Sequence, residues 1–132
     1  MINPILLRLA KVAILSKFHS NLTMDKIKLF NAYSFLNQQG ATFVTLNYKH
    51  NLRGCIGSLI SHRLLIDDVM HNAYAAAFND RRFHKLEEKE FNDLTLEVSV
   101  LSEPQEIQYS DFDDLIGKIT PSKDGLILKH PK

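Results

Sequence analysis

The 132-residue sequence contains a single cysteine, Cys55, and no tryptophan. One cysteine excludes an internal disulfide and any metal site made of cysteines alone. No apolar stretch approaches the roughly 20 residues that cross a bilayer. The leucine-rich N-terminal stretch lacks both a basic leader and a small-residue cleavage site. We therefore expect a cytoplasmic protein with no membrane span.

What the chain does contain is typical of one globular domain. Apolar residues make up 45% of the sequence and charged residues 23%, which excludes wholesale disorder. A chain of this length can bury roughly two-thirds of its surface on folding, so it needs neither disulfides nor a structural metal. We expect residues 1–132 to form a single domain.

Charge is distributed unevenly along the chain, although the net charge is only +1. Residues 1–63 hold eight basic side chains and one acidic one, whereas residues 64–132 hold eight basic and fourteen acidic ones. One interpretation is that the two halves fold onto each other with complementary charge. The other is a basic surface for phosphates or nucleic acid. We favour the first because the basic half has no dense cluster of lysine and arginine.

Hydrophobic periodicity predicts an α+β fold. The strand patterns lie close together in the sequence and lack the regular alternation with helices that is typical of parallel sheets. We therefore expect a mainly antiparallel sheet flanked by helices. The polar connection 49–51 should close a hairpin, in which Asn51 tolerates the left-handed conformation that such turns need. Helices are predicted at about 4–18, 25–38, 64–79 and 111–119, a single helical turn at 86–91, and strands at 42–48, 52–59, 94–101 and from 126.

Familiar catalytic motifs are absent from the sequence. It has no P-loop, no GxGxxG, no HExxH and no GxSxG; these patterns carry nucleotide binding, zinc-dependent hydrolysis and serine hydrolysis. The six histidines show no tight metal-ligand spacing. We predict neither a metal site nor a bound cofactor.

The segment 52–57, with the sequence LRGCIG, is the strongest candidate for a functional site. On a strand, Arg53 and Cys55 would point to the same face, because side chains two apart do so. A neighbouring guanidinium lowers the pKa of a thiol and so favours the reactive thiolate. Gly54 and Gly57 would leave room for a ligand, a second backbone or a bulge.

The same residues also fit a purely structural role. Cys55 can be a small buried hydrophobic residue whose flanking glycines serve packing, and spacing alone favours this interpretation. A nucleophilic cysteine also needs a base. The sequence places none of the three candidate bases beside Cys55: His50, His62 and His84.

The loop that contains Arg81-Arg82-Phe83 presents a similar choice. It can grip a phosphate and stack a base. Alternatively, Phe83 anchors the loop in the core and the arginines stay in water, which is the commoner arrangement and the one we favour.

The segment LRGCIG resembles the signature hexapeptide of the AMMECR domain family, which is named after a human chromosomal region. Other parts of the chain resemble the same family in the same order, so the resemblance covers most of residues 5–128. It implies an antiparallel sheet flanked by helices, in a larger and a smaller lobe. The supporting segments are the opening helix 7–15, the strand 40–46, the helix and loop 67–83, and the later strands 97–102 and 124–128.

The resemblance implies little about activity, because the family is largely uncharacterised, and it leaves open whether this chain is an enzyme. Bacterial relatives are often encoded beside, or fused to, a Memo-like domain and a radical SAM protein. This association implies an accessory or enzymatic part in a multi-protein modification pathway, with Memo-like and radical SAM proteins as partners.

Two features depart from the family pattern. His84 follows Phe83 where relatives usually have proline. The family domain generally continues for several dozen residues past the strand 124–128, whereas this chain ends at Lys132. We therefore expect that the C-terminal part of the domain is lacking, and that an unpaired strand edge or an apolar patch is exposed unless a partner covers it.

Two hypotheses follow for the site. In the first, Arg53 and Cys55 are catalytic candidates in a cleft: Arg53 binds an anion or polarises a carbonyl, and Cys55 acts as a thiolate or contacts the ligand. In the second, the same segment is the interface of a non-catalytic module that binds a protein or RNA. Of the further binding candidates, Glu97 is expected to pair with Arg53 if their strands adjoin. These candidates are Gly54, Ile56, Gly57, Glu97, Arg82 and Phe83.

Overall fold

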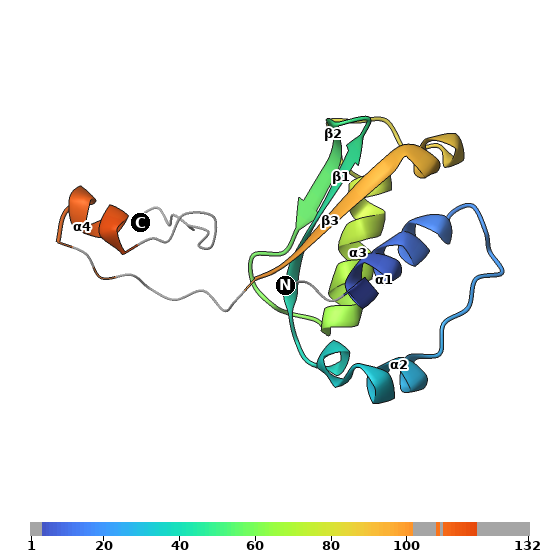
Figure 1. Ribbon diagram of the computed structural model, residues 1–132, viewed down its shortest axis with the longest axis horizontal. Coiled ribbons are helices and arrows are strands. Elements are labelled where there is room, and N and C mark those ends of the chain that lie inside the picture. Colours follow the sequence, from blue (N-terminus) through green and yellow to red (C-terminus); the bar gives the residue numbers. More distant parts are fainter. Residues whose placement is uncertain (1–3, 102–107, 109, 119–132) are drawn as a thin grey trace. The chain divides into compact units, whose positions relative to one another are not determined.

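The computed structural model describes residues 4–101, 108 and 110–118 (Figure 1). The chain forms two compact units, residues 1–102 and residues 103–132. The first unit contains α1 (Pro4–Leu15), α2 (Lys26–Ala32), the 3-10 helix η1 (Ser34–Asn37), β1 (Ala41–Tyr48), β2 (Asn51–Gly57), α3 (Leu65–Phe78), the 3-10 helix η2 (Glu88–Asp93) and β3 (Leu94–Leu101). The second unit contains α4 (Phe112–Gly117). The strand predicted from residue 126 lies outside the described residues.

The first unit is a three-stranded antiparallel sheet with helices on one face, so the predicted α+β class is confirmed. The strand order is β2-β1-β3, and both pairings are antiparallel. Helix α3 packs on β1 and β2, and α1 packs on α3 and on β3 (Figure 1). Within residues 4–101 no helix packs on the opposite face of the sheet, which is called the open face below.

The hydrophobic core lies between the sheet and the helices α1 and α3. Helix α1 turns one aliphatic stripe toward it, as the 3.6-residue period predicts. Burial of these large aliphatic side chains supplies most of the stability of such a layer, at about 1.5–3 kcal/mol for each one. The largest fully buried apolar side chains are Ile14, Leu36, Val44, Leu46, Ile66, Val69 and Val98.

The helix predicted at 25–38 is two shorter helices. Helix α2 begins after Asp25, whose carboxylate accepts a hydrogen bond from the Lys28 amide at 3.2 Å. The chain then leaves the helical conformation at Tyr33, with φ −138° and ψ 80°. No side chain of α2 is buried, whereas Leu36 in η1 is fully buried. The break therefore separates a helix that touches the core only through the partly buried Leu29 and Phe30 from a turn that inserts Leu36 into it.

A two-residue turn joins β1 and β2 into the predicted hairpin. The residues with positive φ are Lys49 (50°) and His50 (71°), which is the geometry of a type I′ turn. Asn51 instead pairs with Tyr48 as the first residue of β2. The expectation that Asn51 takes the left-handed conformation was therefore wrong, because the right-handed twist of the strands favours a tight turn with two left-handed residues.

Strand β3 spans the predicted residues 94–101, but its burial is incomplete. Leu96 and Val98 are buried, whereas Val100, on the same face, is 47% exposed. Helix α3 packs mainly over β1 and β2 and so does not cover this position. Among the described strands β3 pairs with β1 alone, which makes it an edge strand.

The short helices were predicted in outline. The helical turn expected at 86–91 is η2, which begins after Glu87 with reciprocal capping by Glu87 and Glu90. In the second unit, α4 begins after Asp111, whose side chain accepts a hydrogen bond from the Asp114 amide at 2.8 Å.

None of the helices in the described part of the chain has the length and apolar character that a bilayer span requires.

Candidate functional site

A β-bulge lies within the LRGCIG segment on β2. Leu46 pairs with Gly54 and Asn47 pairs with Leu52, so Arg53 is an extra residue with no partner on β1. A bulge disrupts the alternation of side chains between the two faces of a sheet. Arg53 and Cys55 therefore do not share a face, as simple alternation had predicted.

Arg53 is buried in an ion pair with Glu90 of η2. Its Nε donates to Glu90 Oε2 at 2.9 Å and its Nη2 donates to Glu90 Oε1 at 3.1 Å. Only 7% of the Arg53 side chain and 10% of the Glu90 side chain are exposed. The Arg53 guanidinium holds the pKa of Glu90 below its ordinary value, helped by the hydrogen bond from the Glu87 amide. The pairing of Arg53 with Glu97 required adjoining strands, and this condition is not met, because β1 separates β3 from β2.

The Arg53–Glu90 pair gives Arg53 a structural task. Glu90 engages Nε and Nη2 of Arg53, whereas the buried Nη1 has no hydrogen-bond partner among the described residues. The pair fastens η2 to the bulge of β2. Glu90 was missed at the level of sequence, although the three-residue spacing of Glu87 and Glu90 is a capping-box signal that marks a helix start.

The two glycines of the segment are packed against other parts of the protein. A Cβ on Gly54 would lie 2.1 Å from the backbone oxygen of Ala76 in α3. A Cβ on Gly57 would lie 2.0 Å from the ring of Phe43. These glycines allow a helix backbone and an aromatic ring to approach the strand, so they do not form an open floor for a ligand. Ile56 packs against the edge of the core.

Cys55 lies on the open face of the sheet. It pairs with Thr45, which in turn pairs with Glu97, so the three side chains form a row across β2, β1 and β3. The Cys55 sulfur lies 3.3 Å from Thr45 Oγ1, and Cys55 is only partly buried. The Cys55 amide, on the outer edge of β2, donates to Asp80 Oδ2 at 3.0 Å.

Asp80 joins Cys55 to Arg82. Its carboxylate accepts three hydrogen bonds from Arg82: from the amide and Nε at 3.1 Å and from Nη2 at 2.7 Å. These bonds, foremost the one from the Arg82 side chain, hold the pKa of Asp80 far below its usual range. The loop after α3 thus occupies the edge of β2 and places an arginine beside the signature strand.

Phe83 lies between two guanidinium groups. The guanidinium carbons of Arg82 and Arg53 are 5.3 Å and 6.0 Å from its ring centre, within the range of cation–π attraction. Arg82 is exposed, as expected, but Phe83 is only half-buried and is not among the residues packed against the core; Leu86 is the buried core residue of this loop. His84, the departure from the family pattern, has a 75% exposed side chain with Nε2 3.8 Å from Glu90 Oε1.

The described residues show no base for Cys55. No hydrogen bond joins its sulfur to His50, His62 or His84 in that part of the chain; its one such contact is with Thr45. The same residues contain no group of three or more histidine, cysteine or acidic side chains arranged to hold a metal ion.

A second polar cluster is fully buried at the start of α3. Asp68 has no exposed surface, and its carboxylate accepts hydrogen bonds from the Thr42 amide and hydroxyl, from Ser58 Oγ and from Asn72 Nδ2. Arg63 Nε lies 3.0 Å from Asp68 Oδ1 without the alignment of a hydrogen bond. The cluster fastens β1, the segment after β2 and α3 together.

Ion pairs connect the basic first half of the chain to the acidic second half. Lys26 pairs with Asp67 at 2.8 Å, and the pairs of Arg53 and Arg63 also cross between the halves. These contacts support the interpretation that the uneven charge is internal complementarity. They reduce the basic surface that nucleic acid would need.

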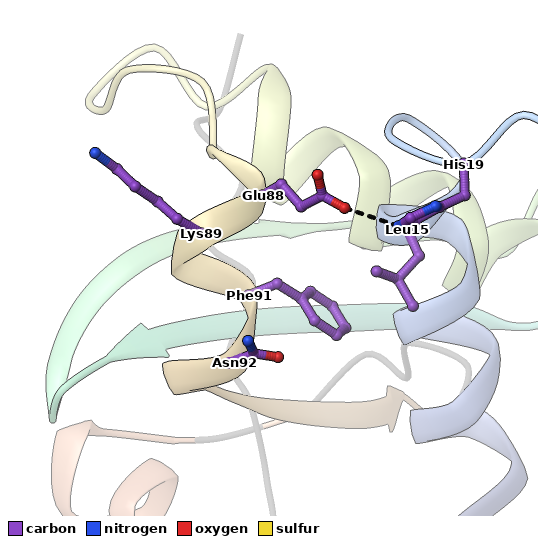
Figure 2. Close-up of a pocket in the computed structure, with 6 residues that line it drawn as sticks. All are labelled: Leu15, His19, Glu88, Lys89, Phe91 and Asn92. Atoms are coloured by element: carbon purple, nitrogen blue, oxygen red, sulfur yellow. Dashed lines mark ion pairs between the residues drawn. The ribbon is translucent and has the colours of Figure 1, made fainter.

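A pocket of about 560 Å³ lies apart from the LRGCIG segment (Figure 2). It lies between the end of α1 and η2, and Figure 2 shows Phe91 and Leu15 with the pair formed by His19 and Glu88. His19 Nε2 and Glu88 Oε2 are 2.8 Å apart. None of the candidate site residues lines this pocket.

Comparison with known proteins identifies the class. The sequence profile of the AMMECR1 family matches residues 7–132, and the chain therefore belongs to the AMMECR1 family. The crystal structure of uncharacterized protein PH0010 from Pyrococcus horikoshii is similar in fold, with a TM-score of 0.70 and 31% sequence identity. That similarity covers 79% of this chain and 53% of PH0010.

Archaeal relatives show the same partial coverage. A protein from Sulfolobus acidocaldarius is 36% identical over 130 residues, which are 95% of this chain and 56% of that protein. A protein from Methanothermobacter thermautotrophicus is 39% identical over 93 residues, which are 70% of this chain and 48% of that protein. The chain thus spans about half the length of the relatives it matches.

Proposed function

We propose that this AMMECR1-family chain is an accessory component of a multi-protein modification pathway and binds a ligand or partner on the open face of its sheet. Memo-like and radical SAM proteins are the partners that the family resemblance implies. The observation that carries the proposal is the row formed by Cys55, Thr45 and Glu97, on the sheet face opposite α1 and α3.

Three features favour a binding surface. Cys55 and Thr45 are partly accessible and Glu97 is exposed, so the row offers a thiol, a hydroxyl and a carboxylate to a ligand. Asp80 fixes the backbone of Cys55, and the Arg53–Glu90 pair fixes the bulge beside it. A surface held in place by buried polar contacts loses little entropy when it binds.

A catalytic role for Cys55 is the alternative. A thiolate nucleophile requires activation by a base or a cation. Arg53, the predicted cation, is instead paired with Glu90. The guanidinium of Arg82 is likewise paired with a carboxylate, that of Asp80. We therefore favour Cys55 as a contact residue over Cys55 as a nucleophile.

Substitutions at Cys55 separate the two roles. Cys55→Ser and Cys55→Ala keep the side chain small, whereas Cys55→Trp fills the space above the row. If the face binds a partner, retention of co-expressed Memo-like and radical SAM proteins in affinity purification should survive the small variants and be lost with Cys55→Trp. Ile27→Trp on α2 is the matched control, because Ile27 is 73% exposed and lies outside the sheet.

Two outcomes would count against the proposal. Full retention of both partners by Cys55→Trp would show that the open face is not the binding surface. Loss of cellular function in Cys55→Ser and Cys55→Ala, together with alkylation of Cys55 faster than that of a free thiol, would identify a nucleophile instead.

A further inference from the structure

The guanidinium of Arg82 is held in one orientation but is not enclosed. Its Nε and Nη2 donate to the two oxygens of Asp80, whose side chain is only 6% exposed. The Arg82 side chain is 57% exposed. One edge of the guanidinium is therefore fixed by a buried carboxylate. In the described part of the chain Nη1 forms no hydrogen bond, which leaves that side of the group for water or a ligand.

The electrostatic surroundings of Arg82 favour an anion. Residues 81–86, RRFHKL, contain two arginines and a lysine and no acidic residue. The charge of Asp80 is directed inward, where its two oxygens accept four N–H groups. The carboxylates that follow in the sequence are paired: Glu87 with Lys89, Glu88 with His19 and Glu90 with Arg53. An incoming anion thus meets the donors of Arg82 before it meets any unpaired acid of this loop.

Arg82 is also beside the proposed binding face. Asp80 Oδ2 accepts both from Arg82 Nη2 at 2.7 Å and from the Cys55 amide at 3.0 Å. The two donors therefore share one acceptor atom, and the guanidinium lies at the margin of the row that begins with Cys55. A ligand in contact with the Cys55 sulfur would have its end within reach of Arg82.

We propose that ligands of this face carry an oxyanion, a carboxylate or a phosphate, which the exposed edge of the Arg82 guanidinium binds beside Cys55. The proposal rests on the proposed function, since it names the chemical class of ligand for the same face. An arginine oriented by a carboxylate presents planar paired donors that match an oxyanion. Asp80 is then a positioning residue, and Arg82 is the contact.

Alkylation of Cys55 by two nearly isosteric reagents tests this directly. Iodoacetate carries a carboxylate and iodoacetamide does not, and Cys55 is the only cysteine of the chain, so mass spectrometry follows its modification without ambiguity. The ratio of the two rates on the folded, full chain cancels any change in the thiolate fraction. Arg82→Gln should lower the iodoacetate-to-iodoacetamide ratio about three- to fivefold at low salt, and about 0.5 M salt should remove most of the difference.

Matched variants separate Arg82 from general charge. Arg81→Gln removes the same charge from the neighbouring exposed residue and should change the ratio less than about twofold, because exposed charges farther from the sulfur are screened. Arg82→Lys keeps the charge and should retain most of the ratio. An unchanged ratio in Arg82→Gln, or an equal fall in Arg81→Gln, would overturn the proposal.

Protection experiments identify the source of the oxyanion. Acetate or inorganic phosphate, compared with chloride at equal ionic strength, should slow the alkylation by iodoacetamide in the unmodified chain and not in Arg82→Gln. Protection by acetate alone indicates a carboxylate ligand, and protection by phosphate alone indicates a phosphate ligand. If neither acetate nor phosphate slows the alkylation more than chloride does, the proposal of an oxyanion site is overturned.

The same alkylation data distinguish failure of the proposed function from failure of the oxyanion contact alone. If iodoacetamide, which is neutral, modifies Cys55 only when the chain is unfolded in urea, the open face is inaccessible and the proposed function fails. If iodoacetamide modifies the folded chain readily but Arg82→Gln leaves the iodoacetate-to-iodoacetamide ratio unchanged, only the oxyanion contact is wrong and the proposed binding face is not contradicted.

Discussion

Removal of Glu90 should strongly destabilise the fold, because it leaves the buried guanidinium of Arg53 without its carboxylate partner. Arg53 and Glu90 approach to 2.9 Å and 3.1 Å and are about nine-tenths buried. At an effective dielectric constant of 20, charges at this distance attract by about 5 kcal/mol, of which desolvation offsets a large part. With Glu90→Ala the desolvation cost of Arg53 remains and the attraction is lost. We expect a loss of about 3–5 kcal/mol in the free energy of unfolding.

Urea unfolding followed by circular dichroism measures this effect. With a slope of about 1–2 kcal/mol per M for a chain of this size, the midpoint should fall by roughly 1.5–5 M. Lys89→Ala is the control on the same element, because Lys89 pairs with Glu87 at an exposed position and its loss should barely move the midpoint. The double variant Arg53→Met/Glu90→Leu should recover most of the stability, since it removes both charges.

The pH dependence of the same comparison follows from the lowered pKa of Glu90. The folded-state pKa lies below the unfolded value because Arg53 stabilises the carboxylate. The contribution of this group is therefore complete above the unfolded pKa and is lost as the pH falls through the folded pKa. The stability difference between the unmodified chain and Glu90→Gln should be constant near neutral pH and shrink in acid. A difference that is negligible at pH 7, or that grows in acid, would refute the reasoning.

Further substitutions test other parts of the structure. Gly54→Ala should cost about 1–3 kcal/mol, because its Cβ would lie 2.1 Å from the Ala76 oxygen; an unchanged melting temperature would contradict this packing. His50→Gly should raise the melting temperature slightly, by relieving a positive φ of 71°, and a fall would count against the turn geometry. Asp68→Ala should cost about 3–5 kcal/mol in urea unfolding, far more than Asp67→Ala at the adjacent, half-exposed position; equal effects would show that the buried network contributes little.

Much of the fold could be predicted from local patterns. The alternation in 94–101 predicted β3 with its observed bounds, and the helical period predicted α1 and α3 to within three residues at each end. Such patterns succeed because each element buries one face, and burial imposes a period of two or 3.6 on the sequence. The predicted helix at 25–38 failed at Tyr33, where the need to bring Leu36 into the core overrides helical propensity.

The candidate site residues remain a prediction, but the structure shows how they are arranged. It brings Arg82 and Phe83 close to the segment LRGCIG, a proximity that the sequence did not indicate. The partner of Arg53 was not predicted either, because a bulge of one residue changes which face a side chain takes. No periodic pattern encodes a bulge, and Glu90 is 37 residues away in the sequence.

The sequence by itself determined the α+β class, the hairpin and the AMMECR1 family, and it indicated LRGCIG as the candidate site. These properties depend on residues near one another in the chain. The tertiary structure decided which charges meet: Arg53 with Glu90, and Arg82 with Asp80. Those pairings depend on how the loop after α3 returns to the edge of β2, and only packing fixes that path. They place the single cysteine of the chain on the open face of the sheet, next to an arginine that Asp80 orients.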